Sequence, residues 1–190
     1  MGRPVPHATV GMVWAQTPGG VIAVDDELPW DVPEDFRHFR DTVAGRPVVV
    51  GRTTWDSMPG PWRRARTAAS VVVTRDPAWH GAPDEHPVRA GSLPEAIATA
   101  SLPVGTPDAA PPPDEVWIMG GGQVYAQGIA YADLLVVSEI DVPEPGPDAA
   151  ATRAPAIDEA TWRECTPADV AGWRVSRTGT GWRILHYRRR

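Results

Sequence analysis

Two runs of consecutive valines constrain the fold of this chain more than any other feature of its sequence. Residues 48–50 and 71–73 are all valine, so a strand formed by either run presents apolar side chains on both faces and has to be covered on both sides. Strands of this kind are typical of a parallel sheet that lies between helices.

Other apolar, β-branched runs recur along the chain, and amphipathic segments separate them. We expect strands at 8–15, 47–50, 70–74, 115–119, 134–140 and 182–187, and helices at 33–43, 93–100 and 123–130. This order predicts an α/β fold with a single, mostly parallel central sheet, an antiparallel C-terminal strand and helices on both faces.

Proline-rich segments mark the expected loops. The chain has 22 prolines, and many of them fall in 103–113 and 143–155. Because proline has no backbone N–H to donate, neither segment is expected to lie inside a sheet. The strands on either side of each segment are too few for separate cores, so both are interpreted as surface loops of one domain that covers residues 1–190.

Composition excludes several classes of function. The net charge is −6, which argues against general nucleic-acid binding. A single cysteine, Cys165, rules out an internal disulfide and a cysteine zinc cage, and the five histidines lack metal-ligand spacing. The sequence shows neither a membrane-length apolar run nor a signal peptide. We therefore expect a soluble, cytoplasmic protein with no metal, nucleic-acid or membrane partner.

One carboxylate stands out in the segment 28–40. Asp31 and Glu34 have the spacing of a capping box, and Pro33 suits a first helical turn. Asp35 then lies on the flank of the apolar stripe expected to face the core, which consists of Val32, Phe36, Phe39 and Val43. Because an unpaired carboxylate is unfavourable there, Asp35 is either a functional group or a second capping residue.

Two glycine-containing turns follow expected strands. In residues 51–54 (GRTT), backbone N–H groups and hydroxyls suit a phosphate, with Arg52 either as its charged partner or as a solvated side chain. The three glycines at 120–122 separate a strand from a helix and let the backbone approach a ligand closely. Their spacing differs from that of the staggered dinucleotide fingerprint, so it does not identify the ligand. A purely structural turn seldom needs three consecutive glycines, so we favour contact with a ligand.

Taken in order, these segments resemble the dihydrofolate reductase family. The matching motifs are 13–16 (VWAQ), 20–22 (GVI), 28–30 (LPW), 33–35 (PED) with Phe39, 51–55 (GRTTW), 120–125 (GGGQVY) and 137–141 (VSEID). The similarity covers residues 8–187. It implies NADPH-dependent reduction of 7,8-dihydrofolate to tetrahydrofolate, by hydride transfer to pterin C6 and protonation at N5, for one-carbon and thymidylate metabolism.

The resemblance also implies roles for the residues that would meet the substrate. Asp35 would accept paired N–H bonds from the pterin, with a pKa raised by burial, and Ser138 would bond this carboxylate. Trp30 would position a water, and Tyr125 would lie near the nicotinamide. The substrate walls would be Val13, Ala15, Leu28, Phe36, Phe39, Met58 and Met119, and the loop 19–28 would close as a lid.

For NADPH, the resemblance implies a pyrophosphate turn at Gly121 and Gly122, and an adenosine 2′-phosphate site formed by Arg52, Thr74 and Arg75. Two arginines beside that dianion favour NADPH over NADH. The full set of implied cofactor contacts is Ala15, Ile22, Gly51, Arg52, Thr53, Thr54, Thr74, Arg75, Gly120, Gly121, Gly122, Gln123, Val124 and Tyr125.

The chain departs from the family at two places. Ala68 stands where the family has an arginine for the glutamate tail of the substrate, and Arg66 is assigned that role with Arg64 as the alternative. The lid carries Ala23, Asp25 and Asp26, which leaves its kinetics open. The expected partners are dihydrofolate and antifolate inhibitors, and the expected state is a monomer.

Two rival interpretations remain. The riboflavin-pathway pyrimidine reductase shares the fold and cofactor, but its first strand runs into a Ser-x-Asp-Gly turn where this chain has TPGG at 17–20. A non-catalytic folate- or NADPH-binding protein is the other, because the tail arginine is missing.

Overall fold

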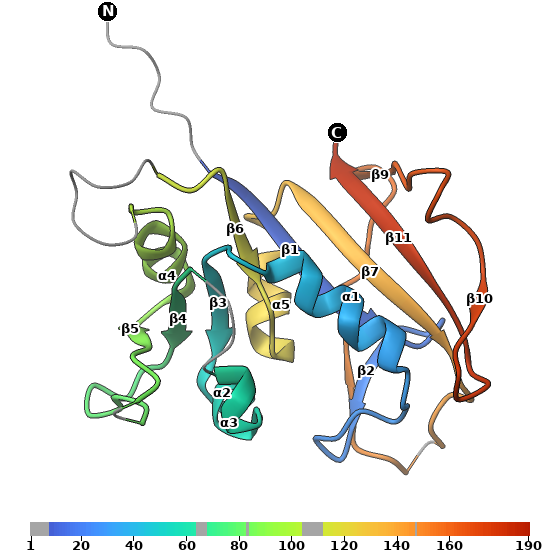
Figure 1. Cartoon of the computed structure of the whole chain (residues 1–190), viewed down its shortest axis with the longest axis horizontal. Helices are drawn as coiled ribbons and strands as arrows, with labels where there is room; N and C mark the ends of the chain where they lie inside the picture. The colour runs from blue at the N-terminus through green and yellow to red at the C-terminus, as the bar shows by residue number, and fades with distance from the viewer. Residues whose placement is uncertain (1–7, 64–67, 83, 104–111, 147) are drawn as a thin grey trace, which may run out of the picture.

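A central sheet of nine strands organises the computed structural model (Figure 1). The structure describes residues 8–63, 68–82, 84–103, 112–146 and 148–190. The sheet order is β10-β11-β7-β1-β6-β3-β4-β5, and β9 also pairs with β11. Its strands are β1 (Thr9–Gln16), β3 (Val48–Gly51), β4 (Ser70–Val73), β5 (Val88–Ala90), β6 (Glu115–Ile118), β7 (Leu134–Asp141), β9 (Trp162–Glu164), β10 (Arg174–Val175) and β11 (Gly181–Arg189).

Strands β1 and β3 to β7 pair in parallel, whereas β11 pairs antiparallel with β7, β9 and β10. Val48, Val49 and Val50 are fully buried, as their valine run predicted; in the second run Val71 and Val72 are buried and Val73 is partly buried. The predicted fold class is therefore confirmed, including the antiparallel C-terminal strand.

Helices cover both faces of the sheet. They are α1 (Pro33–Val43), α2 (Arg52–Ser57), α3 (Gly60–Arg63), α4 (Leu93–Ala100) and α5 (Gly122–Gly128). Side chains alternate along a strand, so Met12 of β1 packs in the apolar cluster of α4 and α5, while Val13 packs in that of α1 and α2. Figure 1 shows α1 in front of the sheet and α5 behind it.

The predicted helices 33–43 and 93–100 have the bounds of α1 and α4, and α5 begins one residue before its predicted start. The prediction of 143–155 as a loop outside any sheet is wrong in part. Within it, β8 (Ala151–Arg153) pairs antiparallel with β2 (Val21–Val24) in a separate two-stranded sheet. The prolines of this segment stand before and after 151–153, so these three residues keep their backbone donors. Most of the other predicted loop, 104–111, lies outside the described residues.

The predicted capping box of α1 is also wrong. Val32 is the N-cap and makes no side-chain cap hydrogen bond. Glu34 instead accepts hydrogen bonds from the Ser176 hydroxyl at 2.6 Å and the Arg177 N–H at 3.1 Å, in the turn between β10 and β11. These bonds lower the pKa of the Glu34 carboxyl, the Ser176 bond most. Glu34 thus joins two segments that are distant in the sequence.

The apolar stripe of α1 is only partly buried. Val32 and Val43 are buried and Phe39 packs against the core, but Phe36 is 45% exposed. Asp35 is buried instead, so the buried face of the helix is rotated toward Asp35 and leaves Phe36 at its edge. A helix wheel fixes the spacing of side chains but not this rotation, which depends on the sheet beneath.

Candidate active site

The candidate site lies along the edge where the parallel strands end. Gln16 ends β1, and Gly120, Arg52 and Thr74 follow β6, β3 and β4, which are neighbours in the sheet in that order. Carboxyl ends of adjacent parallel strands meet at one edge, where ligands of α/β proteins commonly bind. Segments that are distant in the sequence are therefore brought side by side.

At one end of this edge, α1 holds the Asp35 carboxyl over the sheet. Asp35 is 8% exposed. Removal from water raises its pKa to about 6, and a hydrogen bond with the Ser138 side chain opposes this shift. Ser138 lies in β7, directly between Ala15 of β1 and Ile184 of β11. The strands on either side of β7 therefore fix the position of the Ser138 hydroxyl that hydrogen-bonds the Asp35 carboxyl.

An apolar cluster lies on the face of the sheet that α1 covers. Six of the predicted residues belong to the apolar cluster on the α1 face of the sheet or pack against it, namely Val13, Ala15, Trp30, Phe39, Met58 and Met119. Leu28 and Phe36, also predicted for the substrate walls, are 58% and 45% exposed. The structure thus brings six of these side chains together and leaves two large apolar groups at the surface.

The three glycines form a bend packed against the turn after β3. The Gly51 N–H donates to the Gly120 carbonyl at 2.6 Å. A Cβ added to Gly121 would lie 2.5 Å from the Thr54 hydroxyl oxygen, and one added to Gly122 would lie 2.6 Å from the Thr152 methyl carbon. Side chains cannot be placed at the bend without displacing these threonines. The surface of the bend therefore consists of backbone and hydroxyl groups. This surface fits a pyrophosphate.

Tyr125 supports the bend from inside the protein. It is 5% exposed, its hydroxyl donates to the Val13 carbonyl at 2.7 Å, and burial raises its pKa. A Cβ on Gly120 would lie 2.9 Å from the Tyr125 ring. The phenol is therefore placed to link β1 to the glycine bend, and its proton is already engaged.

The predicted lid at 19–28 contains a paired strand and a tight turn. Within it, β2 pairs with β8, and Val24 and Glu27 exchange backbone hydrogen bonds at 2.9 Å. The two residues between them, Asp25 and Asp26, have positive φ angles of 50° and 63°. Positive φ at both central residues is the geometry of a type I′ hairpin turn, in which asparagine and glycine are preferred.

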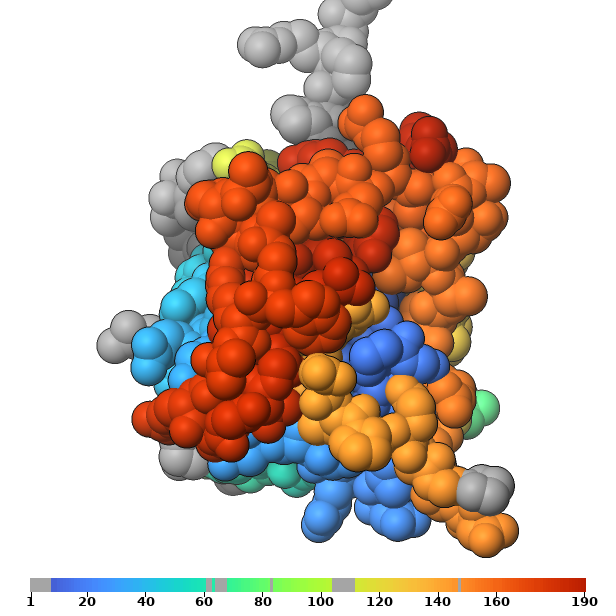
Figure 2. Space-filling model, turned by 90° about the vertical axis from the view of Figure 1, so that its right-hand side faces the viewer, coloured from blue at the N-terminus to red at the C-terminus, as the bar shows by residue number. Residues whose placement is uncertain are grey.

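Two charged side chains hold the base of the lid. The Glu144 carboxylate accepts the Gly19 N–H at 2.8 Å, and Arg153 donates to the Gly19 carbonyl at 2.5 Å. Figure 2 shows the lid (blue) and the segment after β7 (orange) side by side on one face of the molecule. Neither side chain was among the predicted site residues, because short polar segments give no signal of which distant backbone they contact.

At the other end of the site, Arg52 is paired with carboxylates. Its Nε lies 3.3 Å from Asp56 and its Nη1 lies 2.9 Å from Asp76, and the side chain is 43% exposed, so Arg52 is solvated and also paired, which leaves both predicted alternatives open. Thr74 is buried and accepts a hydrogen bond from the Asp76 N–H at 3.2 Å, while Arg75 is exposed. The predicted residues of the 2′-phosphate site are therefore adjacent in space, and Asp56 and Asp76 are neighbours that the sequence did not indicate.

The two arginines predicted for the glutamate tail, Arg66 and its alternative Arg64, lie outside the described residues. Arg63, the residue before them, already has partners within the protein. Its Nε pairs with Glu85 at 2.6 Å, and its Nη1 donates to the Met58 carbonyl at 2.8 Å.

Two kinds of feature are absent from the part of the chain that the structure describes. In that part, no group of three or more His, Cys, Asp or Glu side chains is arranged to hold a metal ion. The same residues contain no helix that is long and apolar enough to cross a membrane.

Comparisons with known proteins agree with this arrangement. The family model described as dihydrofolate reductase matches residues 9–174. A dihydrofolate reductase from Mycobacterium tuberculosis (strain ATCC 25618 / H37Rv) is 37% identical over 180 residues, which is 95% of this chain and 98% of the relative. One from Neisseria meningitidis (strain DSM 15465 / Z2491) is 36% identical over 171 residues, 88% of this chain and 90% of the relative.

Among solved structures, a dihydrofolate reductase from Enterococcus faecalis complexed with NADP(H) and RAB-propyl superposes with a TM-score of 0.73. It is 23% identical and the match covers 96% of this chain and 97% of that chain. This likeness supports the fold, and the sequence relatives support the family.

Proposed function

The chain belongs to the dihydrofolate reductase family, whose reaction is the NADPH-dependent reduction of 7,8-dihydrofolate to tetrahydrofolate, and we propose that Asp35 is the group around which this reaction is organised here. The observation that carries the proposal is a carboxyl that is 8% exposed and bonded to Ser138, on the helix that covers the apolar cluster of Val13, Phe39 and Met119. Such a group is unfavourable for folding, so a role in binding and catalysis accounts for it.

For the substrate, the two oxygens of Asp35 would accept N–H bonds from the amino group and a ring nitrogen of the pterin. The apolar side chains around the carboxyl suit the faces of a flat ring, with Leu28 and Phe36 available at the rim. Trp30 packs against the same cluster and would position a water beside the carboxyl. C6 of the pterin would receive the hydride that NADPH supplies when bound, and N5 would receive the proton.

The raised pKa of Asp35, about 6, matters for the proton. A carboxyl that titrates close to neutral pH can hold or release a proton under operating conditions, which is what general acid catalysis needs. Activity is therefore expected to decline as the pH rises above 6, as this carboxyl loses its proton.

For the cofactor, the bare backbone at 120–122 and the Thr53 and Thr54 hydroxyls would receive the pyrophosphate, and Arg52, Thr74 and Arg75 the 2′-phosphate. When bound, NADPH supplies the hydride from its nicotinamide. The remaining proposed contacts are Ala15, Ile22, Gly51, Gln123 and Val124, and Tyr125 would support the nicotinamide end through its bond to the Val13 carbonyl.

The first experiment is an absorbance assay of the purified protein at the NADPH band. Oxidation of NADPH that requires dihydrofolate supports the proposed function, and turnover of a riboflavin-pathway pyrimidine in its place would reject it. Methotrexate and NADPH titrations complete the test, because tight binding of both without turnover identifies a non-catalytic binding protein.

A second experiment addresses the cofactor site. Changing Arg52 and Arg75 together to alanine should reduce the preference for NADPH over NADH, because two positive charges near the dianion are removed. An unaltered preference would show that the 2′-phosphate binds elsewhere.

The glutamate tail is assigned to Arg66, with Arg64 as the alternative. If neither holds it, KM for dihydrofolate rises while kcat changes less, because tail contacts are the same in ground and transition states. Comparing dihydrofolate with a pterin that lacks glutamate measures this, and a large preference for the full folate means that the tail site is intact.

We propose one domain, supported by the single nine-stranded sheet, a monomeric state, a cytoplasmic location and binding of antifolate inhibitors. Light scattering during size exclusion tests the monomer, and the methotrexate titration tests inhibitor binding.

A further inference from the structure

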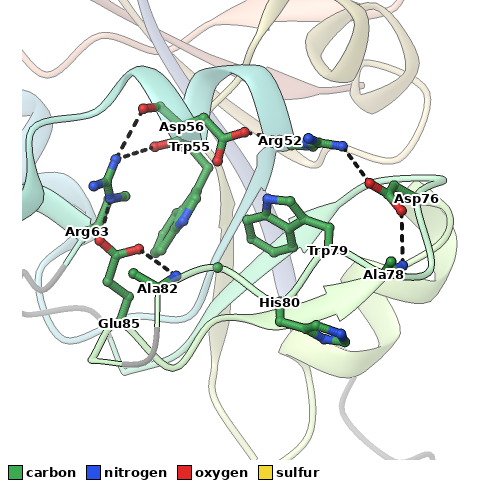
Figure 3. A pocket seen from close by; sticks show the side chains of 11 residues that line it. Arg52, Trp55, Asp56, Arg63, Asp76, Ala78, Trp79, His80, Ala82 and Glu85 are labelled. Carbon is green, nitrogen blue, oxygen red and sulfur yellow. Dashed lines mark hydrogen bonds and ion pairs between the residues drawn. The ribbon is translucent and has the colours of Figure 1, made fainter.

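Arg52 is held between two carboxylates that belong to different elements. Asp56 lies on the same helix one turn later, and Asp76 follows β4. Figure 3 shows the guanidinium of Arg52 with one carboxylate on each side, at the rim of a cavity of about 480 Å³. The side chains are close to half exposed, 43% for Arg52 and 42% for Asp76, so solvent and a ligand can both reach the pair.

The Asp76 carboxylate is fixed by its own turn. Its Oδ1 accepts the Ala78 N–H at 3.0 Å, while its Oδ2 faces Arg52. Its backbone is held as well, since the Asp76 N–H donates to Thr74 and the Arg89 Nε donates to the Asp76 carbonyl at 2.9 Å. The negative charge therefore cannot easily move away when another anion approaches Arg52.

We infer that Asp76 sets how strongly this protein distinguishes NADPH from NADH, by competing with the 2′-phosphate for Arg52. This inference rests on the proposed function, in which Arg52, Thr74 and Arg75 receive that phosphate. Asp76 is the next residue after Thr74 and Arg75, so its carboxylate stands in the same turn as the proposed phosphate ligands.

Repulsion by the Asp76 carboxylate acts on the 2′-phosphate of NADPH and not on NADH. An incoming 2′-phosphate either displaces Asp76 from the guanidinium or binds beside it, and in both cases it meets a fixed like charge. NADH has a neutral hydroxyl at the same position and does not meet this repulsion. Asp76 therefore weakens NADPH binding while leaving NADH binding almost unchanged, and Asp56 adds a smaller effect because its contact with Arg52 is longer.

Asp76→Asn tests the inference with little disturbance of the turn, because the asparagine Oδ1 can still accept the Ala78 N–H. We expect this variant to bind NADPH about three- to tenfold more tightly and NADH less than about twofold differently, with a gain that shrinks as salt is added. Dissociation constants are measured by quenching of tryptophan fluorescence without dihydrofolate. Calorimetric titration with adenosine 2′,5′-bisphosphate and with AMP isolates the phosphate contribution.

The matched control is Asp169→Asn, which removes the same charge from an exposed residue in the connection between β9 and β10, at the opposite edge of the sheet. The inference is overturned if Asp76→Asn leaves the affinity for the bisphosphate unchanged or weakens it, or if the control variant gains as much. It is also overturned if Arg52→Ala binds the bisphosphate as tightly as the parent protein. A parent protein that binds NADPH but does not reduce dihydrofolate rejects the proposed reaction and leaves the role of Asp76 standing.

Discussion

Asp35 and Arg52 lie at the two ends of one sheet edge, and their charges are governed by different physical effects. Asp35 is almost completely removed from water and has one hydroxyl partner, so desolvation dominates and raises its pKa to about 6. Arg52 is 43% exposed between two carboxylates, so neighbouring charges and solvent screening dominate. The buried end should therefore respond strongly to single changes, and the exposed end weakly and in a salt-dependent way.

The largest expected effect is at the buried end. Asp35→Asn is nearly isosteric and should fold, but it loses the charge and the proton, so reductase activity at pH 7 should fall by at least about 100-fold. Turnover at saturating substrate measures this, with circular dichroism to verify folding. Asp41→Asn, an exposed carboxylate on the same helix, is the control, and near-normal turnover by folded Asp35→Asn would contradict the role of Asp35.

The second effect is on stability. The pKa of Asp35 is about 6 in the folded protein against 3.8 for the ordinary group, so the folded state holds its proton more tightly than the unfolded state. The stabilisation from this proton is complete below pH 3.8 and is lost as the pH rises through 6, a change of about 3 kcal/mol. Asp35→Asn should therefore exceed the parent protein in unfolding free energy at pH 8, and by less at pH 4. Urea titrations at pH 4 and pH 8 measure the unfolding free energies of both proteins. The same difference between variant and parent at both pH values would reject a buried Asp35 that titrates near 6.

A smaller effect is expected from Ser138→Ala. The hydrogen bond with Ser138 lowers the Asp35 pKa, so its removal should move the pH midpoint of kcat/KM upward, by less than about one unit, and change the rate at pH 6 by less than about tenfold. A pH profile of both proteins measures the midpoint. A downward shift would mean that Ser138 stabilises the protonated carboxyl.

The smallest effect belongs to the exposed end. Asp56→Asn removes a solvent-exposed pair at 3.3 Å between residues one helical turn apart, so the free energy of unfolding should change by less than about 0.5 kcal/mol. Denaturation in low and high salt measures it. A loss of unfolding free energy well above 1 kcal/mol that salt does not reduce would show that the exposed end is as sensitive to a single change as the buried end.

The sequence was informative wherever one segment determined its own environment. The valines at 48–50 needed cover on both faces and therefore predicted their strand, the helix period placed Asp35 at the boundary of the core, and three glycines predicted a bend bare of side chains. Contacts between distant polar segments were not predictable. Glu144 and Arg153 hold Gly19, and Glu34 binds Ser176 instead of capping its helix, because these partners are chosen by the packing of the whole chain.

The pairing of β2 with β8 joins segments that are about 130 residues apart in the chain. During synthesis, residues 21–24 leave the ribosome long before their partner at 151–153 exists. A nascent chain that already contains Asp35 and the three glycines therefore still lacks the strand that pairs with β2, and this two-stranded sheet can form only after residue 153 has been synthesised.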